Sequence, residues 1–410
     1  MTGVTADPRQ RRFRAHFPAL KDVVHLAGCS IAPRSDALDA ALARMLDAMA
    51  RPASTWHLFE EEGERVRHRF AALVGARPEQ IALVPNASVG AHQAASGLDL
   101  RRRPRIVTTT AEFPSLAHVW LAQRPRGAEV VFAEDTAGSG KAGADPEDGA
   151  AAAAPEGRTA RALAEAVDAR TALVSVPLAT YRAAERLPAA RIARAARQAG
   201  AAVLVDAYQA LGVEPIDVDE LGCDFLVAGA SKYLLGLPGI AFLYVRDPGA
   251  AAQPPALTGW FGRRDPFAFD PRVLDWADSG RRYETGTPPV PALYAAGAGL
   301  DLLSRVDAHA IRAHVTALGT HAADRLTRAG ARLLSPPDPG RRGAHLALHD
   351  TDPAALAAHL ERRGIAVAPR GDVVRLSFHY YTDAADIDIA CAEIEDYRRS
   401  GTPAAYGRLT

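Results

Sequence analysis

The sequence predicts an α/β fold in which a large domain with a mainly parallel sheet is joined to a smaller α+β domain. Three observations in the 410-residue chain lead to this prediction. Seven short runs rich in β-branched residues are apolar throughout rather than alternating, which is typical of strands that helices bury on both faces. Helical patterns separate several of these runs, and alternating strands and helices indicate an open sheet. Near residue 300 the pattern changes to a long helical stretch followed by short strands and helices.

The large domain is expected to contain a seven-stranded sheet with helices between its strands. Residues 157–169 and 187–200 carry apolar side chains at helical spacing, and Gly200 ends the second pattern, as glycine often does. Residues 137–157 are rich in Gly, Ala and Pro without periodicity, and we interpret them as a flexible surface insertion. The predicted strands lie at 81–84, 105–110, 129–133, 171–176, 202–206, 224–228 and 240–245.

The sequence pattern in the last quarter of the chain predicts a smaller domain with both strands and helices. Strands are expected at 345–349 and 373–378, and helices at 353–363 and 383–399. We therefore expect three parts, namely an N-terminal segment 1–30 that packs on the small domain, a large domain 31–290 and a small domain 291–410.

Composition and charge argue against several classes of function. The 48 basic and 48 acidic residues cancel, so no net charge favours nucleic acid or an anionic membrane as a partner. No apolar run has the length of a signal peptide core or a membrane span. The three cysteines, Cys29, Cys223 and Cys391, form neither a C-x-x-C pair nor a disulfide framework. We expect a cytoplasmic protein without a metal site.

One lysine and one aspartate in residues 203–245 carry the main functional signal. The chain has only three lysines, Lys21, Lys141 and Lys232, and the other 45 of its 48 basic residues are arginines. Asp206 ends an apolar strand, where a carboxylate is costly unless positive charge meets it. One interpretation is a structural pair of Asp206 with an arginine, plus a surface lysine. The other is a Schiff-base lysine with a carboxylate that keeps the pyridine nitrogen of pyridoxal phosphate protonated.

The second interpretation is favoured by a family resemblance. The stretch DAYQALGVEPIDVDELGCDFLVAGASKYLLGLPGIAFLYV, residues 206–245, resembles the core signature of class V aminotransferases. This group of pyridoxal-phosphate enzymes includes cysteine desulfurases, kynureninases and isopenicillin N epimerase-like proteins, and the last two are the most similar subgroup. The resemblance covers most of the chain, from about residue 23 to residue 388. It implies fold type I and pyridoxal 5'-phosphate as the cofactor.

The resemblance implies a role for each matching residue around the cofactor ring. Lys232 would form the Schiff base and later move the α-proton of the substrate. Asp206 would pair with the pyridinium nitrogen, and Gln209 would form a hydrogen bond with the phenolic oxygen. Phe113, in AEFPSLAHVW, would stack on the pyridine ring, although a phenylalanine before a proline is otherwise a core residue.

A second group of residues would bind the phosphate. The segment PNASVGAHQAAS follows the strand 81–84 and opens a helix, and the N–H groups at a helix N-terminus favour phosphate. Ala87, through its backbone, and Ser88 are the predicted phosphate residues. Taken alone, this segment would be an ordinary cap formed by Asn86 or Ser88. Ser231, directly before the lysine, resembles another phosphate-contacting position.

The remaining predicted residues concern the substrate and a second subunit. Thr287, in RRYETGTPP, resembles a residue that reaches the phosphate of the neighbouring subunit, which implies a homodimer with shared active sites. Trp260, in ALTGWFGRRDPFAFDP, resembles a kynureninase tryptophan beside the active site, but is otherwise a packing residue. Arg375 resembles the arginine that binds the substrate α-carboxylate, because a planar guanidinium suits a carboxylate. Arg370 is the fallback for this role.

Departures from the subgroups leave the reaction open. Desulfurases need a mobile nucleophilic cysteine, which we expect near 335–345, and this stretch has none. Kynureninases carry a tyrosine before the lysine and an aspartate two positions after their Phe-Pro pair, where this chain has Ser231 and Leu116. We expect transamination of an α-amino acid, with a carbon–sulfur or carbon–carbon lyase, an epimerase and a non-catalytic relative as alternatives.

Overall fold

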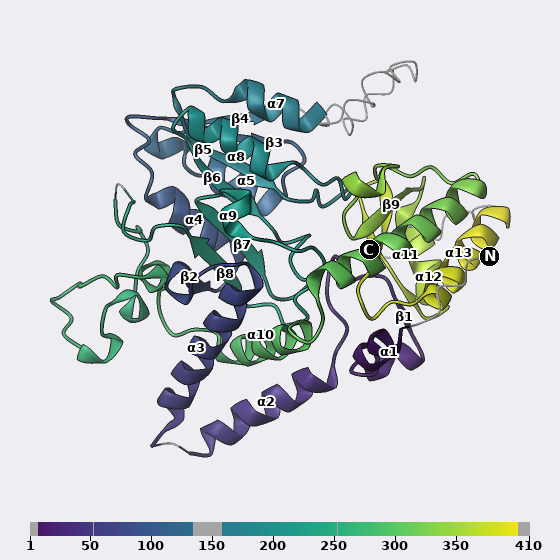
Figure 1. Cartoon of the computed structure of the whole chain (residues 1–410), viewed down its shortest axis with the longest axis horizontal. Helices are drawn as coiled ribbons and strands as arrows, with labels where there is room; N and C mark the ends of the chain where they lie inside the picture. The colour runs from purple at the N-terminus through teal and green to yellow at the C-terminus, as the bar shows by residue number, and fades with distance from the viewer. Residues whose placement is uncertain (1–6, 52, 134–157, 252, 401–410) are drawn as a thin grey trace, which may run out of the picture.

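A seven-stranded sheet forms the centre of the larger lobe (Figure 1). The structure is a computed structural model that describes residues 7–51, 53–133, 158–251 and 253–400. The strand order is β2-β8-β7-β6-β5-β3-β4, and only β8 runs antiparallel to its neighbours. The strands are β2 (Ile81–Val84), β3 (Arg105–Thr109), β4 (Glu129–Ala133), β5 (Thr171–Pro177), β6 (Ala202–Asp206), β7 (Phe225–Gly229) and β8 (Ala241–Val245). All seven predicted strands and the mainly parallel sheet are confirmed.

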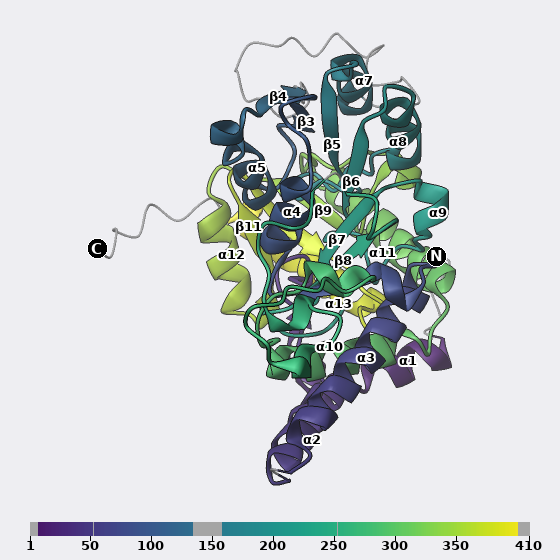
Figure 2. The ribbon, with the colours of Figure 1, turned by 90° about the vertical axis from the view of Figure 1, so that its left-hand side faces the viewer.

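Burial explains the continuous apolar runs. The side chains of β2, β5 and β8 are buried at every position, because helices cover both faces of the sheet. Figure 2 shows α4 (Ala87–Ser96) and α5 (Pro114–Leu121) on one side, with α7 (Arg158–Ala166), α8 (Ala189–Gln198) and α9 (Val218–Leu221) on the other. The predicted insertion at 137–157 lies outside the described residues. None of the described helices combines the length and apolar character needed to cross a membrane.

The antiparallel strand β8 has a simple local cause. The connection from β7 to β8 covers only residues 230–240 and contains no helix, so it is too short for a crossover to a parallel strand. The chain therefore turns back at the carboxyl edge of the sheet. Lys232 lies within this turn.

Long helices lie between and below the two lobes. α2 (Asp36–Met49) extends away from the body of the molecule, and α3 (Thr55–Leu73) returns to it (Figures 1 and 2). Phe70 of α3 stacks on Phe242 of β8 with ring centres 4.0 Å apart. α10 (Val290–Leu303) is buried along most of its length, and α11 (Ala308–Arg328) continues into the smaller lobe.

The smaller lobe combines a three-stranded antiparallel sheet with helices. β12 (Val373–Ser377) lies between β11 (Ala368–Arg370) and β9 (His345–His349), beside α12 (Pro353–Glu361) and α13 (Ala384–Arg399). The N-terminal strand β1 (Val24–His25) pairs in parallel with β10 (Ile365–Ala366). The division of the chain at residues 30 and 290 stays a prediction.

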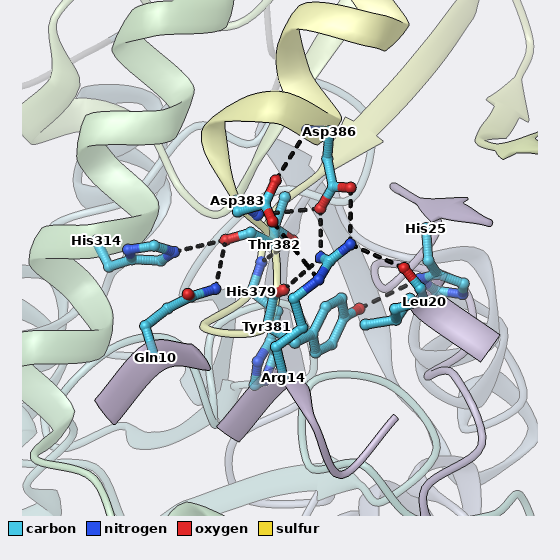
Figure 3. A network of polar contacts seen from close by, with 10 residues as sticks. All are labelled: Gln10, Arg14, Leu20, His25, His314, His379, Tyr381, Thr382, Asp383 and Asp386. Carbon is cyan, nitrogen blue, oxygen red and sulfur yellow. Dashed lines mark hydrogen bonds and ion pairs between the residues drawn. The ribbon is translucent and has the colours of Figure 1, made fainter. Parts of the chain in front are cut away.

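A buried polar network fixes the N-terminal helix α1 (Pro8–Arg14) to the smaller lobe (Figure 3). The Arg14 guanidinium donates two hydrogen bonds, of 2.6 and 3.0 Å, to the Asp386 carboxylate. It also donates to the carbonyl oxygens of Tyr381 and Leu20. Asp386 is only 5% exposed, so its charge depends on this arginine.

We expect Arg14→Ala to lower the free energy of unfolding by about 2–4 kcal/mol, because it leaves a buried carboxylate without its partner. Urea titration measures the change, and hydrogen exchange should rise in residues 24–32. Arg12→Ala on the exposed side of the same helix is the control, with an expected change within about 0.5 kcal/mol. Equal stability of the two variants would show that this ion pair does not hold the N-terminal segment.

Candidate active site

Five segments meet at the carboxyl edge of the large sheet, where ligands of open α/β sheets bind. Asp206 ends β6, Lys232 lies in the turn after β7, and Phe113 follows β3. Tyr181 follows β5. The fifth segment is residues 24–32, which we call the N-terminal strap.

Lys232 is half-buried, and its amine faces two aromatic rings. The Nζ atom lies 4.2 Å from the centre of the Tyr208 ring and 5.5 Å from the centre of the Phe113 ring. Within the described residues, no hydrogen bond or ion pair engages this Nζ atom. Burial lowers the pKa of Lys232 to about 8, because an ammonium loses hydration there. Asp206 and Cys29 oppose this shift, while Arg375 and Arg370 add to it.

Two carboxylates are buried beside each other in the same region. Asp206 is 6% exposed and accepts a hydrogen bond from the Tyr208 N–H at 2.8 Å. Glu112 accepts hydrogen bonds from the Ser175 hydroxyl and the Phe113 N–H, each at 2.9 Å. Burial raises the pKa of both carboxyls, and the charge of Asp206 helps to raise that of Glu112 to about 8.

The Asp–Arg interpretation does not match this geometry. No arginine forms an ion pair with Asp206 in the part of the chain that the structure describes, and Lys232 is not a surface lysine. No arginine therefore compensates the negative charge of Asp206, and a cation placed beside it would stabilise the ionised carboxylate.

The N-terminus of α4 lies at the same edge of the sheet because it follows β2. Asn86 caps the helix by accepting the N–H of Val89 at 3.0 Å, so the ordinary cap is present. The N–H groups of Ala87 and Ser88 find no acceptor among the described residues. Two free N–H groups at a helix N-terminus can bind a phosphate. Ser231 is buried, with its hydroxyl 3.1 Å from the Tyr208 hydroxyl.

The N-terminal strap runs between the two lobes next to Lys232. The Gln209 amide donates to the Cys29 carbonyl at 3.1 Å, while its own Oε1 atom is buried without a partner in the described structure. The Cys29 N–H donates to the Ser377 hydroxyl of the smaller lobe at 3.0 Å. Gly28 has no room for a side chain, because a Cβ atom there would lie 2.9 Å from the Tyr381 hydroxyl.

Arg375 lies on β12 and points toward the large lobe. It is 2% exposed, and it donates to the carbonyl oxygens of Tyr181 at 2.8 Å and Ala368 at 3.3 Å. Its charge also lowers the pKa of His345, after burial as the main cause. Arg370, the fallback, is exposed.

Two predicted residues form no hydrogen bond, ion pair or ring contact with Lys232 among the described residues. Trp260 packs in an aromatic cluster, with ring centres 5.5 Å from Trp56 and 6.1 Å from Phe269. Thr287 is exposed just before α10. The structure therefore brings together Lys232, Asp206, Gln209, Ser231, Phe113 and Arg375, but neither Trp260 nor Thr287.

Comparison with known proteins identifies the family of the chain. A family model described as aminotransferase class-V matches residues 150–389. The chain belongs to this family. It is 32% identical over 383 residues to the uncharacterized aminotransferase YcbU of Bacillus subtilis (strain 168), covering 93% of this chain and 96% of that protein. This confirms the predicted class V membership.

Other class V relatives carry different names. The chain is 25% identical to a kynureninase of Pseudomonas fluorescens, with 86% of this chain and 83% of that protein covered. It is 28% identical to the isopenicillin N epimerase of Streptomyces clavuligerus, with 79% and 81% covered. A solved cysteine desulfurase of Thermococcus onnurineus NA1 has the same fold, with a TM-score of 0.81, 19% identity, and 98% and 100% covered. The predicted fold type I is confirmed.

The cofactor of this class V enzyme is pyridoxal phosphate, and the residues present fit it. The buried carboxylate of Asp206 lies at one end of the site. With it lie the Lys232 amine and the Gln209 Oε1 atom, neither of which has a hydrogen-bond partner among the described residues. Free N–H groups for a phosphate lie at the N-terminus of α4. These are the donors and acceptors that an aldehyde, a ring nitrogen, a phenol and a phosphate require.

Sequence reasoning missed four residues of the site, namely Tyr208, Glu112, Tyr181 and Cys29. Glu112 could have been found as the acidic residue directly before Phe113. Tyr208 could have been found as the bulky residue between Asp206 and Gln209. No sequence signal pointed to Tyr181 or Cys29, because their place depends on contacts between distant segments.

The pKa of Lys232 predicts how its amine reacts in the cofactor-free protein. Only the neutral amine is nucleophilic, so acylation of Lys232 should rise through about pH 8, against about 10.4 for an ordinary lysine. Peptide mass spectrometry after labelling at graded pH measures this, with the exposed Lys21 as reference in the same digest. Asp206→Asn should move the midpoint lower, because Asp206 favours the ammonium form. Identical pH profiles for Lys21 and Lys232 would contradict the assignment.

Proposed function

We propose that this enzyme transaminates an α-amino acid, with Lys232 as the residue that binds pyridoxal phosphate and moves the substrate proton. The observation that carries the proposal is the half-buried Lys232 amine, which faces the ring site without a partner among the described residues. A low pKa keeps part of this amine neutral near pH 8, where it can attack a carbonyl or accept a proton.

Each of the surrounding residues has a task in this proposal. When bound, pyridoxal phosphate supplies an aldehyde for Lys232 and an electron-withdrawing ring next to the substrate. Asp206 holds a proton at the ring nitrogen, and Gln209 binds the phenolic oxygen. Phe113 covers one face of the ring. Ala87, Ser88 and Ser231 hold the phosphate.

Arg375 is the proposed anchor for the substrate α-carboxylate. Its guanidinium is fixed by two backbone carbonyls, one from each lobe, which leaves the Nη2 group without an acceptor in the described structure. A fixed guanidinium orients a carboxylate at little entropic cost. The substrate would then hold its α-proton near the Lys232 amine.

Transamination is favoured over persulfide chemistry by the state of the thiols. Cys29, Cys223 and Cys391 are buried and unpaired, and burial raises the pKa of Cys223 and Cys391 to about 12. None of them is an exposed nucleophile. The name of the Bacillus subtilis relative also supports an aminotransferase. Carbon–sulfur lyase, carbon–carbon lyase and epimerase activities stay alternatives. The unpaired thiols support a cytoplasmic location.

The first test follows the cofactor itself. Borohydride reduction should fix pyridoxal phosphate on wild-type protein and on Lys21→Ala, but not on Lys232→Ala, as measured by intact mass. Amino acids added without a keto acid should then convert the cofactor to its amine form, which absorbs differently and persists. An absorbance that changes and then returns would instead indicate a lyase or an epimerase. A retained adduct in Lys232→Ala would remove Lys232 from this role.

We further propose a homodimer in which Thr287 and Trp260 approach the partner's active site. Large apolar side chains are exposed on α2 and around the aromatic cluster, with Leu46 at 61%, Met49 at 58% and Phe269 at 69%. Exposed patches of this kind usually mark an interface. Thr287 is exposed just before α10, and it forms no hydrogen bond with Lys232 within the described part of its own chain.

Mixing two defective variants tests the shared site. Light scattering should give twice 43.4 kDa for the wild type. Thr287→Val should weaken cofactor binding about tenfold, because a hydroxyl bound to phosphate is lost. When Thr287→Val and Lys232→Ala are co-expressed, the mixed dimer has one site with both residues intact. We expect about one cofactor per mixed dimer at wild-type affinity. Only weak binding would show that Thr287 acts within its own subunit.

A further inference from the structure

Tyr208 lies between Asp206 and Gln209 in the chain and has no task in the proposed function. Its backbone and side chain together make three contacts at this site. The backbone N–H donates to Asp206, the hydroxyl lies 3.1 Å from the Ser231 hydroxyl, and the ring centre lies 4.2 Å from Lys232 Nζ. A ring fixed in this way has one orientation relative to the lysine amine.

The main chain is shaped to accommodate this ring. Gly229 ends β7, and a Cβ atom there would collide with the hydroxyl and ring carbons of Tyr208. The ring therefore lies across the end of β7, in space that any other residue at position 229 would need. Tyr208 also packs against the apolar cluster that contains Ala87 at the start of α4. Gly229 and Tyr208 form a matched pair at the carboxyl edge of the sheet.

A second ring faces the same amine from another strand. Phe113 lies 5.5 Å from Lys232 Nζ, and its backbone N–H is bound by the Glu112 carboxylate at 2.9 Å. The ring of Tyr181 meets it edge-on at 5.2 Å. Phe113 follows β3, whereas Tyr208 follows β6, so the two rings approach the lysine amine from different elements.

We propose that Tyr208 and Phe113 are the two walls of an aromatic clamp that receives the planar ring of the cofactor beside Lys232. The inference rests on the proposed function, because the amine of Lys232 marks where the cofactor aldehyde must lie. Aromatic rings stack with their centres about 4.5–7 Å apart, and the planar faces of both residues are turned to this point. Tyr208 is thus a cofactor-positioning residue, and it acts through the face of its ring.

A non-reactive analogue separates the clamp from the chemistry of the lysine. Pyridoxine 5'-phosphate has the same ring and phosphate but no aldehyde, so its affinity for the cofactor-free protein reports non-covalent binding. Calorimetry gives the affinity, and the induced circular dichroism of the bound ring reports its orientation. Tyr208→Leu removes the wall, whereas Tyr208→Phe keeps the ring and loses only the bond to Ser231. Tyr397→Leu, a buried tyrosine on α13, controls for loss of packing.

We expect Tyr208→Leu to weaken analogue binding about three- to tenfold and to reduce the induced signal, because one stacking face is lost. Tyr208→Phe and Tyr397→Leu should stay within about twofold of wild type. Wild-type affinity and signal in Tyr208→Leu would overturn the clamp. An equal loss in Tyr208→Phe would also overturn it, because the hydroxyl would then carry the effect. If the wild type binds neither the analogue nor pyridoxal phosphate, the proposed function itself fails.

Discussion

Burial of a lysine amine next to buried carboxylates is the constraint on which the rest of the site depends. Burial without a fixed partner lowers the pKa of the Lys232 ammonium, so the amine is a weaker base. Burial also raises the pKa of the carboxyls of Asp206 and Glu112, which are weaker acids for the same reason. The protein tolerates this cost at the carboxyl edge of the sheet because a ligand with complementary groups can offset it. Two aromatic rings face this lysine amine, and Arg375 is fixed on the side of the smaller lobe. The N-terminus of α4, whose first N–H groups have no acceptor among the described residues, lies at the same edge of the sheet.

The turn that carries Lys232 links this centre to the sheet. It is too short for a crossover, so β8 returns antiparallel and the lysine stays at the edge where β6 delivers Asp206. The N-terminal strap closes the other side. Its contacts with Gln209 and Ser377 join the large lobe to the smaller one directly beside the lysine, and Gly28 allows the close approach that this requires.

Most of the fold could be predicted because strands buried on both faces have continuous apolar runs, as in IALV before α4 and AVLVD before Tyr208. The positions of Asp206 and Lys232 could be predicted because Asp206 ends one such strand and Lys232 follows the end of the next, while their roles stay a prediction. Tyr208 and Tyr181 could not, since nothing in their local pattern shows that their side chains turn toward the lysine. The parallel pairing of β1 with β10 could not be predicted from the sequence either, because each strand is two residues long and carries no periodicity. Thr287 and Trp260 differ again, because their proposed task requires a second subunit.

The pairing of Val24 with Ile365 has a consequence for the order in which the protein is made. The strap beside Lys232 is synthesised before the strands of the large sheet, but it takes its place by pairing with β10, which follows that sheet in the chain. A nascent chain can therefore assemble the large sheet while its cofactor site is still open on one side. The strap can take the position seen in the structure only after β10 has been made, so this side of the site forms later than the large sheet.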